Sequence, residues 1–293
     1  MWTTLSAVGI DLRARLDRLG ERFPPLGFVL RVQDRYTAAN GRASANSITL
    51  DGFLALFALI VLAAAVLGFV SASDQGVTHR LINSLGVKGS AEKIITDAVD
   101  TARRSRRTAT IAGVLGLLVT GTGLAVAVAN AYDAAWRVRA RGLLDRMVGL
   151  VWLAGALLIF VAGGFATSLW TRLPATFGPL VVVITVGANT VGFVWTSWVL
   201  PNRRVPVHAL VPAALAGGVA LEVLKVAGGI LVPRLVANSS ELYGTIGAVF
   251  ALLIWLLVLG RLVVYVTVLE VMGWERTHGT TEVLVDAPTL PMR

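Results

Sequence analysis

The chain has 293 residues, a formal net charge of +9 and no cysteine, and 56% of its residues are hydrophobic. Charged residues make up only 15% of the chain, whereas an average soluble domain has about 25%. This composition argues against a soluble globular protein and against a disordered one. The lack of cysteine excludes a disulfide framework, a thiolate metal site and a cysteine nucleophile. Three explanations of the positive charge stay open: binding to nucleic acid, contact with anionic lipid, or arginines that mark one side of a membrane protein.

The N-terminal segment, residues 1–51, has amphipathic helical patterns. Between residues 5 and 23, apolar side chains recur every three or four positions, and Pro24 and Pro25 end the pattern. A second short amphipathic stretch contains Val29, Val32 and Tyr36. We expect the first helix to lie in the cytoplasm, either packed on the rest of the protein or lying on anionic lipid.

Six long apolar runs follow, and each is long enough to cross the roughly 30 Å hydrocarbon core of a bilayer as a helix. They predict an all-α, polytopic membrane protein with six transmembrane helices, forming one domain over residues 52–272. An extramembrane loop, 71–107, contains a further predicted helix, and residues 273–293 read as a flexible tail. The predicted spans cover about residues 52–70, 108–131, 147–170, 176–200, 207–232 and 244–271.

The distribution of arginine and lysine predicts the orientation in the plasma membrane. The two terminal segments and the second and fourth loops carry fifteen of these residues, and the opposite side carries nine. Since positive charge marks the cytoplasmic side, we expect both termini in the cytoplasm. One feature contradicts this orientation: four arginines adjoin the second span on the predicted outer side, namely Arg103, Arg104, Arg106 and Arg107.

Motifs for common enzymatic chemistry are missing from the sequence. His79, His208 and His278 are far apart and show no metal-ligand spacing, and no phosphate-binding loop or nucleophile elbow occurs. The arginines flank the spans and form no domain-sized basic stripe with interleaved aromatic residues, which argues against a nucleic-acid partner. We therefore predict no catalytic residue, no metal, no cofactor and no enzymatic activity, with the lipid bilayer as the partner.

Four charged residues fall within the predicted spans. Glu222 and Lys225 lie three residues apart in the fifth span and can therefore pair, while Arg261 and Glu270 belong to the sixth. Intramembrane charges usually face the interior of a bundle or a water-filled cavity. These side chains therefore line a polar path or form an ion-pair cluster that fixes helix register, and the sequence leaves both interpretations open.

Small residues concentrate in the last two spans, where they allow close helix packing. Gly228 and Gly229, followed by Pro233, also predict a break or kink in the fifth span. Broken helices near intramembrane charges are typical of transporters, so this feature favours transport slightly.

Several segments resemble the YihY/BrkB family of membrane proteins, once labelled ribonuclease BN. The similarity covers about residues 30–275 and rests on the motif residues Asn130, Tyr132, Pro201, Tyr243, Gly244 and Trp255. One departure is Ala55–Ala58 in the first span, which reads Ala-Leu-Phe-Ala where the family usually has Ser-Leu-Phe-Pro. The resemblance implies a six-helix inner-membrane protein linked to lipid handling in the cell envelope. The ribonuclease label is regarded as an error, and this sequence has no nuclease site.

The function expected from these features is a transporter or lipid-handling component of the cell envelope. The alternative is a membrane scaffold that transports nothing, and an enzyme such as a ribonuclease ranks third. A cavity lined by Glu222, Lys225 and Arg261 and open to one side favours transport, whereas a filled bundle favours the scaffold. Substrate, direction, energy source and oligomeric state are not encoded in any feature above.

Overall fold

The structure is a computed structural model that describes residues 21–73, 106–139, 142, 144–170, 178–243 and 245–279. Within these ranges the protein is entirely helical, without strands. The seven helices are α2 (Pro24–Ala38), α3 (Gly41–Ser73), α6 (Arg106–Trp136), α7 (Leu144–Trp170), α8 (Gly178–Val199), α9 (Val207–Tyr243) and α10 (Thr245–His278).

Five helices are long and apolar enough to cross a membrane: α3, α6, α8, α9 and α10. The 27-residue α7 coincides with the third predicted span. Large apolar side chains such as Val119, Leu158 and Val183 lie exposed on the outside of these helices, where lipid would meet them. The prediction of an all-α polytopic membrane protein is therefore confirmed.

The helix ends differ from the predicted spans at several places. α3 already begins at Gly41, and its polar first turns pack on α10. The two helices are so close there that a Cβ on Gly260 would lie 2.7 Å from the Ala45 carbonyl oxygen. α3 also continues unbroken through Ala55–Ala58, which lack the proline usual in the resembled family. At the other end of the chain, α10 extends past Gly273 to His278, so the segment predicted as a tail begins as helix.

The expected break in the fifth span is absent, since α9 is a continuous helix through Gly228 and Gly229. Gly228 instead makes room for the indole ring of Trp255 on α10. The short amphipathic stretch of the N-terminal segment forms α2, in which Tyr36 is buried. The predicted helix over 5–23, the loop helix within 71–107 and the end of the tail lie outside the described residues, apart from a few at their edges.

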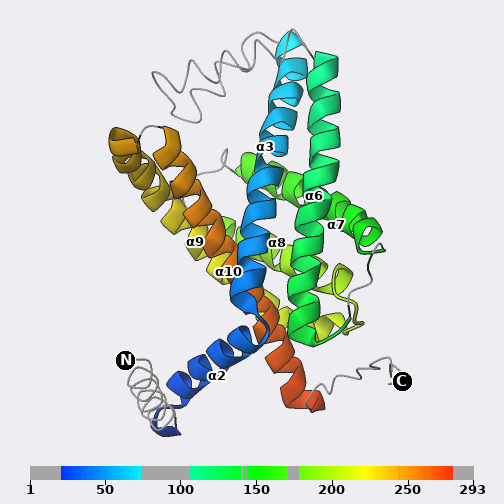
Figure 1. Ribbon diagram of the computed structural model, residues 1–293, viewed down its shortest axis with the longest axis vertical. Helices are drawn as coiled ribbons and strands as arrows, with labels where there is room; N and C mark the ends of the chain where they lie inside the picture. The colour runs from blue at the N-terminus through cyan, green and yellow to red at the C-terminus, as the bar shows by residue number, and fades with distance from the viewer. Residues whose placement is uncertain are drawn as a thin grey trace, which may run out of the picture.

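The helices pack as neighbouring pairs around a central space. α3 and α6 run side by side, α3 also contacts α10, α9 pairs with both α8 and α10, and α7 packs between α6 and α8 (Figure 1). α2 leaves the bundle at the lower end in this view, beside the last turns of α10 (Figure 1).

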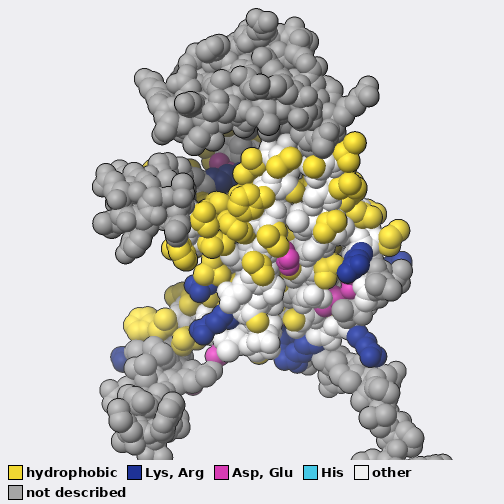
Figure 2. All heavy atoms as spheres, turned by 45° about the horizontal axis from the view of Figure 1, so that its top comes forward, with side chains coloured by type: hydrophobic (Ala, Val, Ile, Leu, Met, Phe, Trp, Pro, Cys, Tyr) yellow, Lys and Arg dark blue, Asp and Glu magenta, His cyan; other side chains and the backbone are white. Residues whose placement is uncertain are grey.

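The lower end, called here the arginine-rich end, is built from α2, the last turns of α6, α8 and α10, and the loops after α6 and α8. Figure 2 shows Lys and Arg side chains gathered around this end, below a band of hydrophobic side chains. The largest cluster of buried residues also lies here, with Tyr132, Trp136, Leu200 and Val268 almost fully buried. The protein is therefore densely packed at its arginine-rich end.

Candidate functional site

Above this dense end, the helices surround a cavity of about 930 Å³. Its volume is at the upper end of the range of about 300–1,000 Å³ typical of ligand pockets. On α8 its lining extends from Ile184 to Thr196, which is about 18 Å along a helix axis. Apolar side chains form most of the wall, among them Ile48, Leu124, Val128, Ile159, Phe193, Leu221, Leu256 and Val263.

A polar cluster lies on the α8–α9 side of this cavity. The Lys225 ammonium donates hydrogen bonds to Asn189 Oδ1, at 2.8 Å, and to Glu222 Oε2, at 3.1 Å. The Asn189 amide donates to the same Glu222 oxygen at 2.9 Å. These three side chains, the Lys–Glu–Asn cluster, therefore join α8 to α9. Among the described residues that line the cavity, Lys225 alone carries a charge.

The Lys–Glu–Asn cluster lies far from the arginine-rich end. Lys225 is eighteen residues into α9, or about 27 Å along its axis from Val207. Asn189 lies ten residues before the end of α8, and the cavity lining continues on both sides of it, from Ile184 to Thr196. A ligand in the cavity would thus meet Lys225 part of the way along the apolar wall.

Close contact between α8 and α9 positions this cluster. A Cβ on Gly218 would lie 2.5 Å from Thr190 Oγ1 and 3.0 Å from two backbone atoms of α8, so only glycine fits at the crossing. Gly218 is four residues before Glu222, and Thr190 follows Asn189, so the same crossing brings the polar side chains together. The predicted packing role of the small residues is visible here and at Gly217, which faces Val266 and Phe193.

Arg261 does not belong to the Lys–Glu–Asn cluster. Its side chain is exposed, does not line the cavity and lies close to Tyr36 on α2. Tyr36 stacks on Tyr265 of α10 with ring centroids 4.5 Å apart. Burial and the neighbouring Tyr265 raise the pKa of the Tyr36 hydroxyl above its ordinary value, and Arg261 partly opposes this change. Arg261 is therefore near the contact between α2 and α10 and is not on the cavity wall.

Glu270 forms a separate, fully buried network near the arginine-rich end. Its carboxylate accepts a hydrogen bond of 2.5 Å from the Ser197 hydroxyl, which in turn lies 3.0 Å from the Tyr132 hydroxyl. All three side chains are 1% exposed or less, and they connect α10, α8 and α6. Of the four intramembrane charges, the structure thus brings together Glu222 and Lys225 and places Arg261 and Glu270 elsewhere.

The residues that carried the family resemblance have structural positions of different kinds. Tyr132 belongs to the Glu270 network, Pro201 is buried in the turn after α8, and Trp255 packs against Gly228. Asn130 is exposed on α6. Tyr243 is the last residue of α9, but its side chain and Gly244 lie outside the described residues.

Asn189 and Ser197 complete the two polar networks, but neither stands out in the sequence. Each is an uncharged residue in an apolar helix and gives little signal by itself. In the described part of the chain, no three His, Asp or Glu side chains gather as they would around a metal ion. The cavity thus has a mostly apolar wall in which Lys225 is the charged side chain among the described lining residues.

Long apolar helices with a ligand-sized cavity between them define a polytopic membrane protein. The chain belongs to the virulence factor BrkB family, whose model matches residues 32–285. This result confirms the resemblance that the sequence motifs indicated.

Several bacterial membrane proteins are similar to this chain. The inner membrane protein YhjD of Escherichia coli K12 is 22% identical over 84% of this chain and 80% of its own length. An uncharacterised protein of Dickeya dadantii is 25% identical over 83% of this chain and 81% of its own. A UPF0761 membrane protein of Ralstonia nicotianae is 26% identical over 73% of this chain, which spans about half (51%) of that relative. No solved structure matches the chain.

Proposed function

We propose that the protein is a non-enzymatic lipid-handling protein of the inner membrane that binds a phospholipid in its central cavity and moves it between leaflets. The observation that carries this proposal is the elongated apolar cavity with Lys225 of the Lys–Glu–Asn cluster as the charged group in its described wall. An acyl chain suits the apolar wall, and a phosphate suits the Lys225 ammonium.

The chemistry of the wall favours a lipid over a small polar solute. A polar solute in the apolar part of the cavity would lose its hydration and find few hydrogen-bond partners, at a cost of several kcal/mol. An acyl chain leaving the bilayer loses no hydration there. Lys225 also suits the phosphate of a phospholipid headgroup, because it is the charged side chain among the described residues that line the cavity.

Orientation follows from the charges at the two ends. Most arginines of the described helices and turns lie at the arginine-rich end, although Arg106 and Arg107 begin α6 at the other end. The positive-inside rule therefore favours a cytoplasmic position for the arginine-rich end, with α2 and the last turn of α10. The Lys–Glu–Asn cluster then lies between this end and the opposite leaflet. The scaffold alternative expects a filled bundle, and the cavity argues against it.

A lipid-scrambling assay tests the proposal. The full-length protein is reconstituted into vesicles with a fluorescently labelled phosphatidylethanolamine, and an impermeant reductant reports which leaflet holds the label. Gly192 lines the cavity and a Cβ there meets open space, so Gly192→Leu fills the cavity without a clash. Gly187 is also open but exposed on the same helix outside the cavity, so Gly187→Leu is the matched control.

We expect the wild-type protein and Gly187→Leu to accelerate the loss of protected label relative to protein-free vesicles, and Gly192→Leu to remove most of the acceleration. Equal rates for wild-type and protein-free vesicles would contradict lipid movement. Full activity of Gly192→Leu would show that lipid does not pass through the cavity.

A further inference from the structure

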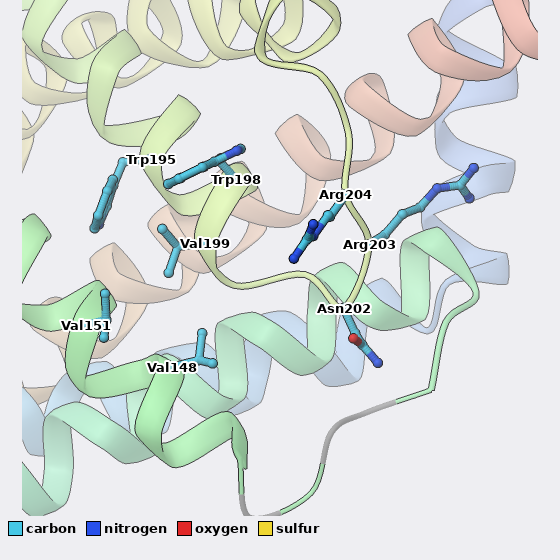
Figure 3. Close-up of a pocket in the computed structure, with 8 residues that line it drawn as sticks. All are labelled: Val148, Val151, Trp195, Trp198, Val199, Asn202, Arg203 and Arg204. Atoms are coloured by element: carbon cyan, nitrogen blue, oxygen red, sulfur yellow. The ribbon is translucent and has the colours of Figure 1, made fainter.

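A second hollow, of about 550 Å³, lies between α7 and α8 where they reach the arginine-rich end. Val148 and Val151 of α7 form one wall and Trp195, Trp198 and Val199 of α8 the other. Arg204, in the turn after α8, closes the end of this groove, which we call the interfacial groove (Figure 3). It does not share the Lys–Glu–Asn cluster and is open to the outside of the bundle.

The wall of the interfacial groove changes from apolar to basic over a short distance. α8 is apolar from Leu180 to Val199 and is followed directly by the polar turn containing Arg203 and Arg204. Tryptophan is enriched where membrane meets water, and two tryptophans stand at this boundary. Trp198 remains 56% exposed, so its ring is available to an outside ligand. The groove thus lies where lipid headgroups meet the acyl region.

The three polar side chains of the turn have different roles. The Arg203 guanidinium lies over the rings of Trp136 and Trp274, 5.0 Å and 5.8 Å from their centroids. The Asn202 amide donates to the Arg139 carbonyl oxygen at 2.8 Å. Asn202 and Arg203 also line the groove, but Figure 3 shows the Arg203 side chain extending away from Trp198 and Val199, whereas Arg204 is directed back toward α8.

Arg204 is therefore the cation available to a ligand in the groove. Its side chain is exposed, and within the described part of the chain it makes no hydrogen bond, ion pair or ring contact. A guanidinium presents two parallel donors that match the oxygens of a phosphate. No acidic side chain lines the groove among the described residues, so an anion would meet no opposing charge there.

We propose that the interfacial groove binds one anionic phospholipid from the adjacent leaflet. Its phosphate pairs with Arg204, its glycerol region packs against Trp198, and an acyl chain follows Val151 along α7. This lipid is a resident ligand at the bundle surface, distinct from the lipid proposed for the central cavity, and its binding does not depend on transport.

Native mass spectrometry tests the proposal on the full-length protein in detergent titrated with phosphatidylglycerol or phosphatidylcholine. We expect one phosphatidylglycerol to be retained more tightly than phosphatidylcholine. Arg204→Gln should weaken this binding about fivefold, the effect of about 1 kcal/mol for one basic side chain near a headgroup. The matched control, Arg31→Gln, removes an equal charge from an exposed position on α2, which packs mainly on α10, α3 and α6.

Two further arms distinguish the lipid from its headgroup. Trp198→Ala, at a half-exposed position, should weaken retention of phosphatidylglycerol while leaving the thermal midpoint unchanged. Glycerophosphoglycerol, the headgroup without acyl chains, should fail to displace the lipid at equal concentration. Equal retention by wild-type and Arg204→Gln, an equal loss in Arg31→Gln, or full displacement by glycerophosphoglycerol would each overturn the proposal.

Discussion

Ser197 of α8 and Glu270 of α10 form a hydrogen bond of 2.5 Å inside the bundle, where each side chain is 1% exposed. The Tyr132 hydroxyl lies 3.0 Å from the same Ser197 oxygen, so the chain of donors ends on the Glu270 carboxylate. In the described part of the protein, the second carboxylate oxygen of Glu270 has no hydrogen-bond partner. The network thus connects three helices through one acceptor.

This network predicts different effects of two Glu270 substitutions on thermal stability. Glu270→Gln keeps an oxygen that can accept from Ser197, so we expect a thermal stability in detergent close to that of the wild type. Glu270→Leu removes the acceptor that joins α10 to α8, while Ser197 can still donate to the Phe193 carbonyl oxygen at 2.8 Å. We therefore expect a loss of about 0.5–1.5 kcal/mol in the free energy of unfolding, the net value of one hydrogen bond. Thermal unfolding of both variants measures the difference, and equal midpoints would show that the hydrogen bonds do not hold α6, α8 and α10 together.

The Lys–Glu–Asn cluster predicts non-additive effects on stability. Lys225→Met leaves the Glu222 carboxylate with Asn189 but without its cation. We expect the free energy of unfolding to fall by about 1–2 kcal/mol. This value is below that for fully buried pairs because the Lys225 side chain is 48% exposed. The double variant Lys225→Met, Glu222→Gln removes both charges and should recover most of the loss. A double-mutant cycle by thermal unfolding checks this expectation, and purely additive effects would contradict it.

The crossing of α8 and α9 predicts a sharp contrast between two glycines of one helix. Gly218→Ala places a Cβ against Thr190 and the α8 backbone, so we expect the helices to separate at a cost of about 1–3 kcal/mol. Gly229→Ala meets open space at an exposed position and should be neutral or slightly stabilising. The thermal midpoint and the rate of lipid scrambling should both fall in Gly218→Ala and stay unchanged in Gly229→Ala. Comparable behaviour of the two variants would show that the crossing tolerates a methyl group.

The proposed orientation can be tested because the chain has no cysteine. A single cysteine is placed either at Ala38, which is exposed at the end of α2, or at Ser90, in the loop between the first two predicted spans. An impermeant maleimide should label Ser90→Cys in intact cells and Ala38→Cys only after the membrane is broken. The reverse pattern would place the arginine-rich end outside and would mean that Arg103–Arg107 mark the cytoplasmic side.

The sequence by itself determined the class of protein and the approximate position of the membrane helices. Long uncharged runs can satisfy their backbone hydrogen bonds within a bilayer by forming helices. The approximate positions and order of the membrane helices therefore follow from where these runs lie in the sequence. The spacing of Glu222 and Lys225 also put both side chains on one face of α9, because residues three apart are neighbours on any helix.

Only the tertiary structure decided which helices those side chains meet. Arg261 and Glu270 share one helix, but Glu270 bonds Ser197 of α8 inside the bundle, whereas Arg261 is exposed and lies near Tyr36 of α2. Asn189 became part of the Lys–Glu–Asn cluster because Gly218 allows α8 and α9 to approach closely. Helical periodicity relates residues within a helix, whereas contacts between helices depend on rotation and crossing, which packing of the whole bundle determines.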